Sequence, residues 1–377
     1  MAKFIRNIIL FILPLLLLVA VTIPVFFMVR GTGEFNSITE SAEEQRKNHN
    51  CVIGLGYNEQ TTYYKLLNAN YYHAPIISLG TSRVMQFKKV SFSSDFYNCG
   101  GAVGGNYNEY MNFLENLDYT PETVIVGLDA WVFNDAWNVG CATYESFQEI
   151  EEVDRGTIPL MKSIFKDWRS GKWKAADLNL YPGNIGFNGR VKDNGFMYDG
   201  SYYYGDLYRD PSSSGDYEFV DTHNRISNGV SRFEWGNHID EDTLRQLENL
   251  LSYCKDNDIR VIGFLAPFAP SIYDLMDESG NYGYLGEINP ACTELFNKYG
   301  FEFYDYMDGG KLDLTDEYFI DGFHGSEIVY GNILKDMVAH NSSVEKYVDI
   351  GRIDELIKHA YSGYVFEDPF SRSSLPD

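Results

Sequence analysis

Ile76-Ile77-Ser78-Leu79-Gly80-Thr81-Ser82-Arg83 is the stretch that decides the fold. A short apolar run ends abruptly in Gly-Thr-Ser, which is typical of a buried parallel strand that stops at a turn. In open α/β sheets, ligands bind in the crevice beyond the carboxyl ends of the strands. A serine there has an exposed hydroxyl close to the backbone N–H groups of the turn. The alternative interpretation is that Ser82 caps the helix that follows.

Short apolar runs of the same kind recur along the chain and alternate with segments of helical periodicity, such as Leu244, Leu247 and Leu251. This alternation predicts an α/β fold with three layers, in which a mainly parallel sheet has helices on both faces. We expect its strands at residues 75–80, 96–99, 123–128, 260–265 and 301–305.

Asp321-Gly322-Phe323-His324 provides the groups that a serine nucleophile needs. A serine hydroxyl becomes reactive when a base takes its proton, and a carboxylate orients that base. Asp321 and His324 are three residues apart, so the carboxylate can reach one imidazole nitrogen and leave the other for Ser82. The serine and the histidine are 324 − 82 = 242 residues apart, so only the fold can bring them together.

These two stretches resemble the SGNH/GDSL hydrolase superfamily, which has a serine after the first strand and an Asp-x-x-His near the C-terminus. The resemblance implies a flavodoxin-like fold over residues 61–345, without a metal or a cofactor. It also implies that Ser82 is the nucleophile, His324 the general base and Asp321 its orienting carboxylate.

The resemblance also implies an oxyanion hole. The family places a glycine N–H after the second strand, and Gly104 or Gly105 matches it, beside the N–H of Ser82. The third block of the family is Gly-x-Asn-Asp, but here Asp129 stands where the asparagine belongs. Either Asp129 points elsewhere and Asn134 or Asn106 supplies the remaining donor, or the third donor is missing.

The departure at Asp129 points to divergent membrane-anchored members, similar to the teichoic-acid D-alanyl-transfer protein and polysaccharide O-acetylation proteins. The first thirty residues fit an anchor, because residues 8–29 form a run of 22 uncharged residues after Lys3 and Arg6. About 20 apolar residues span a bilayer as a helix. We therefore expect an uncleaved signal anchor at 1–30, a stalk at 31–60, and an extracytoplasmic domain on a single-pass membrane protein.

Composition limits the partners. The chain has 30 basic and 54 acidic residues, a net charge of −24, and this argues against nucleic-acid binding. Five scattered cysteines lack paired spacing, which disfavours a zinc site. A disulfide between Cys99 and Cys141 is the first expectation for an extracytoplasmic chain, and Cys254 is expected to be a buried thiol.

Residues 140–236 interrupt the α/β rhythm and are rich in aromatic residues, whereas 346–377 are expected to form a C-terminal tail. Aromatic rings on polar loops suit stacking on sugars, although a small satellite core is the other interpretation. The residues expected to contact substrate are Arg83, Asn106, Trp131, Tyr202 and Tyr204.

Two functions follow as hypotheses. The first is a serine acyltransferase or esterase that acts on acyl groups of cell-envelope glycan, with the acyl ester delivered by a polytopic membrane partner. The second is a catalytically inactive surface module that binds envelope polysaccharide through the same cleft.

Overall fold

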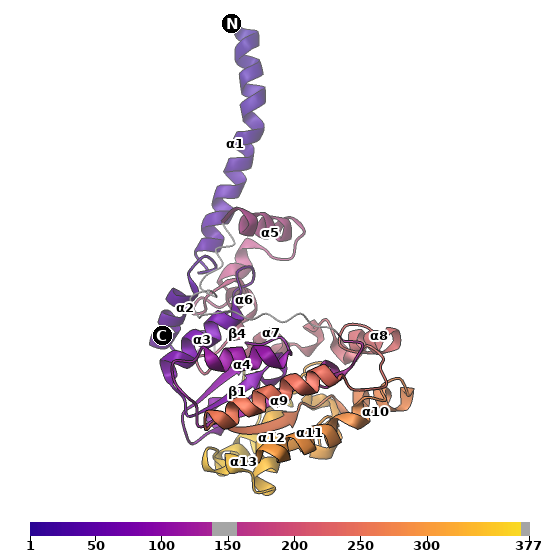
Figure 1. Ribbon diagram of the computed structural model, residues 1–377. Helices are drawn as coiled ribbons and strands as arrows, with labels where there is room; N and C mark the ends of the chain where they lie inside the picture. The colour runs from indigo at the N-terminus through magenta and orange to yellow at the C-terminus, as the bar shows by residue number, and fades with distance from the viewer. Residues whose placement is uncertain (138–156, 371–377) are drawn as a thin grey trace. The chain divides into compact units, whose positions relative to one another are not determined.

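The computed structural model describes residues 1–137 and 157–370 (Figure 1). The chain divides into two compact units. Unit 1 comprises Met1–Gln60 and Glu152–Met197 with Asp377, and unit 2 comprises Thr61–Glu151 and Tyr198–Pro376. The main sheet and the candidate site both belong to unit 2, so each unit is treated by itself below.

Unit 2 contains a five-stranded parallel sheet in the order β2-β1-β3-β6-β7, which confirms the predicted α/β class. All five predicted strands are present: β1 (Ile76–Gly80), β2 (Phe96–Gly100), β3 (Thr123–Leu128), β6 (Arg260–Leu265) and β7 (Glu302–Asp305). The chain extends the sheet on one side of β1 with β2 and on the other side from β3 onward. In doubly wound sheets this reversal, here between β1 and β3, is where ligands bind.

The central strand β1 is buried along its whole length, as its run of apolar residues predicts. It pairs with both neighbours, so that Ile76 lies opposite Phe96 on one side and Thr123 on the other. The strand ends at Gly80, where the backbone of unit 2 is crowded. A Cβ atom on Gly80 would lie 2.9 Å from the Val84 side chain, so a larger residue would push away the turn that carries Ser82.

Helices flank the sheet and complete a three-layer α/β fold. Helix α4 packs against α9, α9 packs against α11, and α12 packs against α13. The helices of unit 2 are α3 (Thr61–Tyr72), α4 (Tyr107–Glu115), α7 (Gly205–Arg209), α8 (Val220–Asn228), α9 (Glu241–Asp256), α10 (Pro270–Ser279), α11 (Leu285–Tyr299), α12 (Glu327–Ala339) and α13 (Ile350–Lys358), and the short strand β5 (Tyr202–Tyr204) belongs to the same unit.

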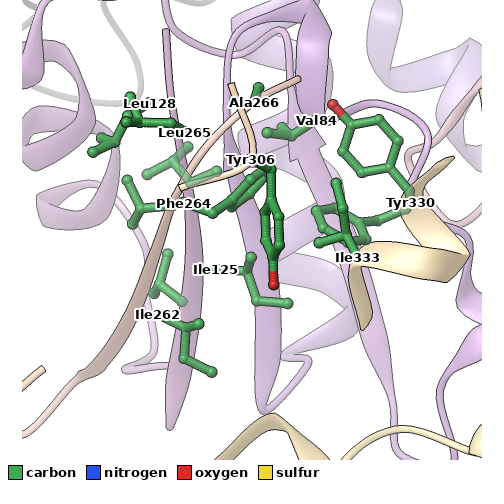
Figure 2. Close-up of a cluster of buried hydrophobic side chains, with 14 of the residues drawn as sticks. Val84, Ile125, Leu128, Ile262, Phe264, Leu265, Ala266, Tyr306, Tyr330 and Ile333 are labelled. Atoms are coloured by element: carbon green, nitrogen blue, oxygen red, sulfur yellow. The ribbon is translucent and has the colours of Figure 1, made fainter. Parts of the chain in front are cut away.

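A cluster of buried hydrophobic side chains joins α12 to the sheet (Figure 2). Tyr330 of α12 lies edge-to-face with Phe264 of β6, with the ring centroids 6.3 Å apart, and with Phe87 at 4.7 Å. Ile333, one turn further along α12, is fully buried. Burying such a side chain stabilises the fold by about 1.5–3 kcal/mol. Because α12 begins just after His324, this packing also fixes the loop that carries the histidine.

Unit 1 has its own small core. Its elements are α1 (Ala2–Arg30), α2 (Ile38–Lys47), α5 (Thr157–Arg169), α6 (Phe187–Lys192) and the short strand β4 (Asn194–Phe196). Helix α2 starts with a capping box, in which Ser37 and Glu40 satisfy each other's backbone N–H groups. Glu34 is fully buried, and its carboxylate accepts backbone N–H groups from Gly56, Tyr57, Asn58 and Phe187.

The segment expected to span a membrane, residues 8–29, lies within helix α1. Within residues 1–137 and 157–370, however, no helix is long and apolar enough to cross a membrane, so the structure does not support the predicted span. The end of α1 is used for packing inside unit 1, where Val25 and Val29 are buried in a cluster with Leu160 and Ile164. Residues 31–60, the expected stalk, include α2 and belong to the same unit.

The expected disulfide between Cys99 and Cys141 is not supported on the Cys99 side. Cys99 is a free thiol buried in β2, and burial raises its pKa to about 12. Cys141 lies outside the described residues. Cys254 is a free buried thiol, as expected.

The other two expected segments contain regular structure. The described part of 140–236 is shared between the two units: α5, α6 and β4 belong to unit 1, and β5, α7 and α8 belong to unit 2. The tail at 346–377 contains α13, which buries Ile353 and Leu356.

Candidate active site

Ser82, His324 and Asp321 form one hydrogen-bonded chain in unit 2, although 242 residues separate the serine from the histidine. Ser82 Oγ lies 2.8 Å from His324 Nε2, and His324 Nδ1 lies 2.7 Å from Asp321 Oδ2. Because an ionised carboxylate only accepts hydrogen bonds, we assign the proton to Nδ1, which leaves Nε2 to accept the Ser82 hydroxyl. This is the geometry that base-assisted attack by a serine requires.

The loop of Asp321 holds its own carboxylate in place. Oδ1 accepts the backbone N–H groups of Phe323 at 2.9 Å and of His324 at 2.8 Å. Burial raises the pKa of Asp321, but the interaction with the His324 imidazole and the backbone hydrogen bonds outweigh burial and hold the pKa below its ordinary value. The carboxylate therefore stays ionised and keeps the imidazole oriented.

Ser82 opens a single turn of 3₁₀ helix, Ser82–Val84, directly after β1. The capping residue of this turn is Thr81, whose Oγ1 accepts the backbone N–H of Arg83 at 3.4 Å. The sequence left open whether Ser82 is itself a cap. In the structure Thr81 has that task, and the Ser82 hydroxyl points to the imidazole instead.

Arg83, the residue after the serine, is the largest fully buried side chain in the described part of the protein. Its Nε–H donates to the carbonyl of Phe323 at 2.8 Å, and Nη2 donates to the carbonyls of Ala266 at 2.8 Å and Pro267 at 2.6 Å. Phe323 directly precedes His324. Arg83 therefore ties the serine turn to the histidine loop rather than facing solvent, where a substrate contact was expected.

Asp129 lies after β3 and completes the environment of Arg83. One carboxylate oxygen lies 3.4 Å from Arg83 Nη1, and the other accepts the Thr81 hydroxyl at 2.7 Å. Burial raises the pKa of Asp129, while the Arg83 guanidinium and the Thr81 hydroxyl oppose that rise. The residue that departs from the family pattern thus forms a buried ion pair.

Aromatic rings surround the same cation. The Arg83 guanidinium lies 5.0 Å from the Trp131 ring centroid and 4.6 Å from that of Phe268. Trp131 is buried and packs edge-to-face against Phe323, whose ring is 4.4 Å from the His324 imidazole. The ring that the sequence marks as a substrate contact therefore lies beneath the histidine loop.

The two candidate glycines differ in the structure. The Gly104 N–H donates to the Glu109 carboxylate at 2.5 Å, so this N–H already has an acceptor. Gly105 is buried at φ +112°, a conformation that favours glycine, and a Cβ there would lie 2.9 Å from Val132 and 3.9 Å from the Thr81 methyl. Of the two, Gly105 is the glycine that the structure places beside the serine turn.

The two candidate asparagine donors have other partners. The Asn134 amide donates to the Glu234 carbonyl at 2.6 Å, and its oxygen accepts the N–H of Ala136 at 3.0 Å. Asn106 caps α4 by accepting the N–H of Asn108 at 3.0 Å. Both side chains support local structure, and no contact joins either of them to Ser82 among the described residues.

Tyr202 and Tyr204 belong to β5 and are half-buried. Their rings lie 4.6 Å apart. The Tyr202 carbonyl accepts hydrogen bonds from the side chains of Gln86 and Lys88, at 3.0 Å and 2.9 Å. These contacts attach β5 to the segment that follows the serine turn.

Sequence reasoning missed Arg232. Its guanidinium lies 5.6 Å from the Trp131 ring centroid and 5.7 Å from that of Phe323. The Phe323 ring in turn contacts the His324 imidazole. Its position in an irregular segment, far from both motifs in the chain, gave no signal. Among the described residues, no group of His, Cys, Asp or Glu side chains is arranged to hold a metal ion.

Comparison with known proteins gives no relative: no protein-family model matches the chain, and no curated protein matches it. The interpretation of this site therefore depends on the geometry of Ser82, Asp321 and His324.

Proposed function

We propose that unit 2 is a serine acyl-transfer enzyme, an acyltransferase or an esterase. The observation that carries the proposal is the chain of contacts from Ser82 Oγ to His324 Nε2 and from His324 Nδ1 to Asp321, at 2.8 Å and 2.7 Å. The position of Ser82 beyond the end of β1, beside the reversal of strand order, adds support.

The proposed reaction has two steps. Ser82 Oγ bonds to the carbonyl carbon of an ester while its proton passes to His324 Nε2. The tetrahedral intermediate then expels the alcohol, which takes that proton and leaves the acyl group on Ser82. In the second step, water or a sugar hydroxyl gives its proton to Nε2 as it attacks the acyl carbon. The bond from that carbon to Ser82 Oγ then breaks, and Oγ takes the proton from Nε2 to restore the serine hydroxyl. The backbone N–H groups of Ser82 and Gly105 are the proposed oxyanion donors.

The identity of the substrate rests on the sequence alone. We propose envelope glycan as the acceptor, a polytopic membrane protein as the source of the acyl ester, and a location at the outer face of the cell membrane. Protease added to intact cells is expected to digest the bulk of the chain. If the bulk of the chain is protected, the location is wrong while the chemistry stands.

A second candidate function is the inactive surface module that binds glycan. The observation that favours it is that the Gly104 N–H and the Asn134 amide both donate to other acceptors, so two of the expected oxyanion donors are already in use. Removing one such donor from an enzyme costs about 10²–10³ in rate.

A fluorophosphonate probe separates the two functions, because it reacts only with an activated serine. We expect the full chain to be labelled, and Ser82→Ala and His324→Ala to abolish labelling. Ser271→Ala is the matched control, since Ser271 is an exposed serine of unit 2 that has no part in the site. Labelling that survives Ser82→Ala would contradict the enzyme and leave the surface module.

Transfer and hydrolysis are then distinguished with an acyl-ester donor, supplied with and without an oligosaccharide acceptor. Transfer gives acylated sugar by mass spectrometry. Release of free acid at a rate that the acceptor does not change would identify a hydrolase.

A further inference from the structure

Arg232 is a cation beside the candidate site. Its charge acts on the buried carboxylate of Asp129, but among the described residues no carboxylate forms a close ion pair with it. It lies in the corner of two nearly perpendicular rings, Trp131 and Phe323, whose planes meet at 88°. No carboxylate or carbonyl within residues 1–137 and 157–370 accepts a hydrogen bond from its guanidinium. In a chain with 54 acidic residues, an arginine left without one is notable.

The backbone holds Arg232 in a strained conformation. Ser231 and Arg232 have φ values of +57° and +80°, in the left-handed region that costs a non-glycine residue of order 1–3 kcal/mol. The Arg232 N–H donates to the Glu234 carboxylate at 3.0 Å, and the carbonyl of the fully buried Phe233 accepts the Tyr282 hydroxyl at 2.9 Å. The backbone is therefore held at the arginine and directly after it, which restricts where the side chain starts.

Arg232 opposes the rise in the pKa of Asp129, but Arg83 and the Thr81 hydroxyl have larger effects on that carboxylate. Asp129 already has Arg83 at 3.4 Å and the Thr81 hydroxyl at 2.7 Å. Arg225 contacts the same ring but has an acidic partner. Its guanidinium lies 5.8 Å from the Phe323 ring centroid and forms an ion pair with Asp221 at 2.5 Å. Arg232 has the equivalent ring contact without the equivalent acid.

We propose that Arg232 binds an anionic group of the substrate, a carboxylate or a phosphate, beside the scissile ester at Ser82. The planar guanidinium donates two parallel hydrogen bonds to such groups, and the ring corner orients it before the ligand arrives. The inference rests on the proposed function and deepens it, because it makes the substrate an anionic ester.

The first test is turnover by the full chain with matched esters. Phenyl acetate and 4-acetoxybenzoate differ by a carboxylate on the alcohol side, and 4-nitrophenyl butanoate and 4-nitrophenyl hydrogen succinate differ by one on the acyl side. We expect kcat/KM to favour the anionic ester of at least one pair by about tenfold, the size of a charge-assisted hydrogen bond.

Arg232→Gln is expected to remove this preference through KM, with kcat changed less than about twofold, since the charge binds the ester without taking part in bond making. Arg225→Gln is the matched control and keeps the preference. Equal loss on neutral and anionic esters, or a preference that Arg232→Gln leaves intact, overturns the proposal.

The second test does not need turnover. Inorganic phosphate and succinate are titrated calorimetrically into the full chain carrying Ser82→Ala, with and without Arg232→Gln. Binding of either anion that weakens about tenfold with Arg232→Gln, but not with Arg225→Gln, supports the site and shows which anion it prefers. If no ester is turned over in a Ser82-dependent way, the proposed function fails and this titration decides alone: anion binding that Arg232→Gln does not change overturns the inference.

Discussion

The ends of β1 and β3 are neighbours in the sheet, and both carry polar residues, but they use them differently. After β1, the Ser82 hydroxyl is directed at a titratable base, His324. After β3, Asp129 and Asn134 are each bound to groups that hold the backbone in place. A polar side chain at the edge of a parallel sheet is therefore not by itself a site. The two strand ends differ in the partner of the polar side chain: Ser82 faces an imidazole that can accept its proton, whereas Asp129 and Asn134 face an arginine and a backbone carbonyl.

The largest expected effect tests the end of β1. Ser82→Ala removes the group that would form the acyl intermediate, so kcat/KM for an ester should fall by about 10⁴–10⁶. Initial rates at saturating and subsaturating ester measure this. If Ser82→Ala retained a tenth of the activity, Ser82 would not be the nucleophile, and its hydroxyl would have only a structural role, like the polar residues after β3.

Arg83→Met is expected to have the next largest effect, on stability. The change leaves Asp129 buried without its cation and three carbonyls without their donor, which should cost about 3–5 kcal/mol in the free energy of unfolding. Urea denaturation measures this cost. Arg260→Met is the control, since Arg260 is the exposed first residue of β6 and should change stability by less than about 0.5 kcal/mol. Equal costs at the two positions would refute the interpretation that Arg83 links the turn of Ser82 to the loop of His324.

Asn134→Ala tests the end of β3. Its amide and its carbonyl oxygen are both hydrogen-bonded to backbone, so we expect about 1–2 kcal/mol of lost stability and turnover within about threefold of the unmodified chain. A loss of about 10²–10³ in kcat, with stability unchanged, would instead identify Asn134 as an oxyanion donor.

The smallest expected effect is on the stability of the fold at low pH, through Asp321. Burial raises the pKa of Asp321, but His324 and the loop hydrogen bonds outweigh burial and lower it in the folded state. A lowered pKa contributes stability that is complete above the unfolded value of about 3.9 and is lost as the pH falls through the folded value. The difference in unfolding free energy between the unmodified chain and Asp321→Asn should therefore shrink below about pH 4. A difference that stays constant from pH 7 down to pH 3 would contradict the pKa assignment.

Sequence was sufficient for features written in local patterns. The five strands are short apolar runs bounded by turn residues, and the Asp321-x-x-His324 spacing places a carboxylate within reach of its imidazole. Sequence was insufficient where the partner is distant. Arg83 resembles an exposed loop cation until the carbonyls of Ala266 and Phe323 close around it, from 183 and 240 residues away.

Asn134 illustrates the same limit, because the Glu234 carbonyl that occupies its amide lies 100 residues further along the chain. Local propensity describes where a strand ends. It does not describe which of the side chains at that end will find an acceptor elsewhere, since tertiary contacts decide that.

The 242-residue separation between Ser82 and His324 has a consequence for the newborn chain. Ribosomes add about 5–20 residues per second, so Ser82 is incorporated into the chain roughly 12–48 s before His324. During that interval the hydroxyl has ordinary alcohol reactivity. If the proposed function holds, a nascent or truncated chain that ends before residue 321 lacks both His324 and its carboxylate, so Ser82 would become reactive only after synthesis has passed residue 324.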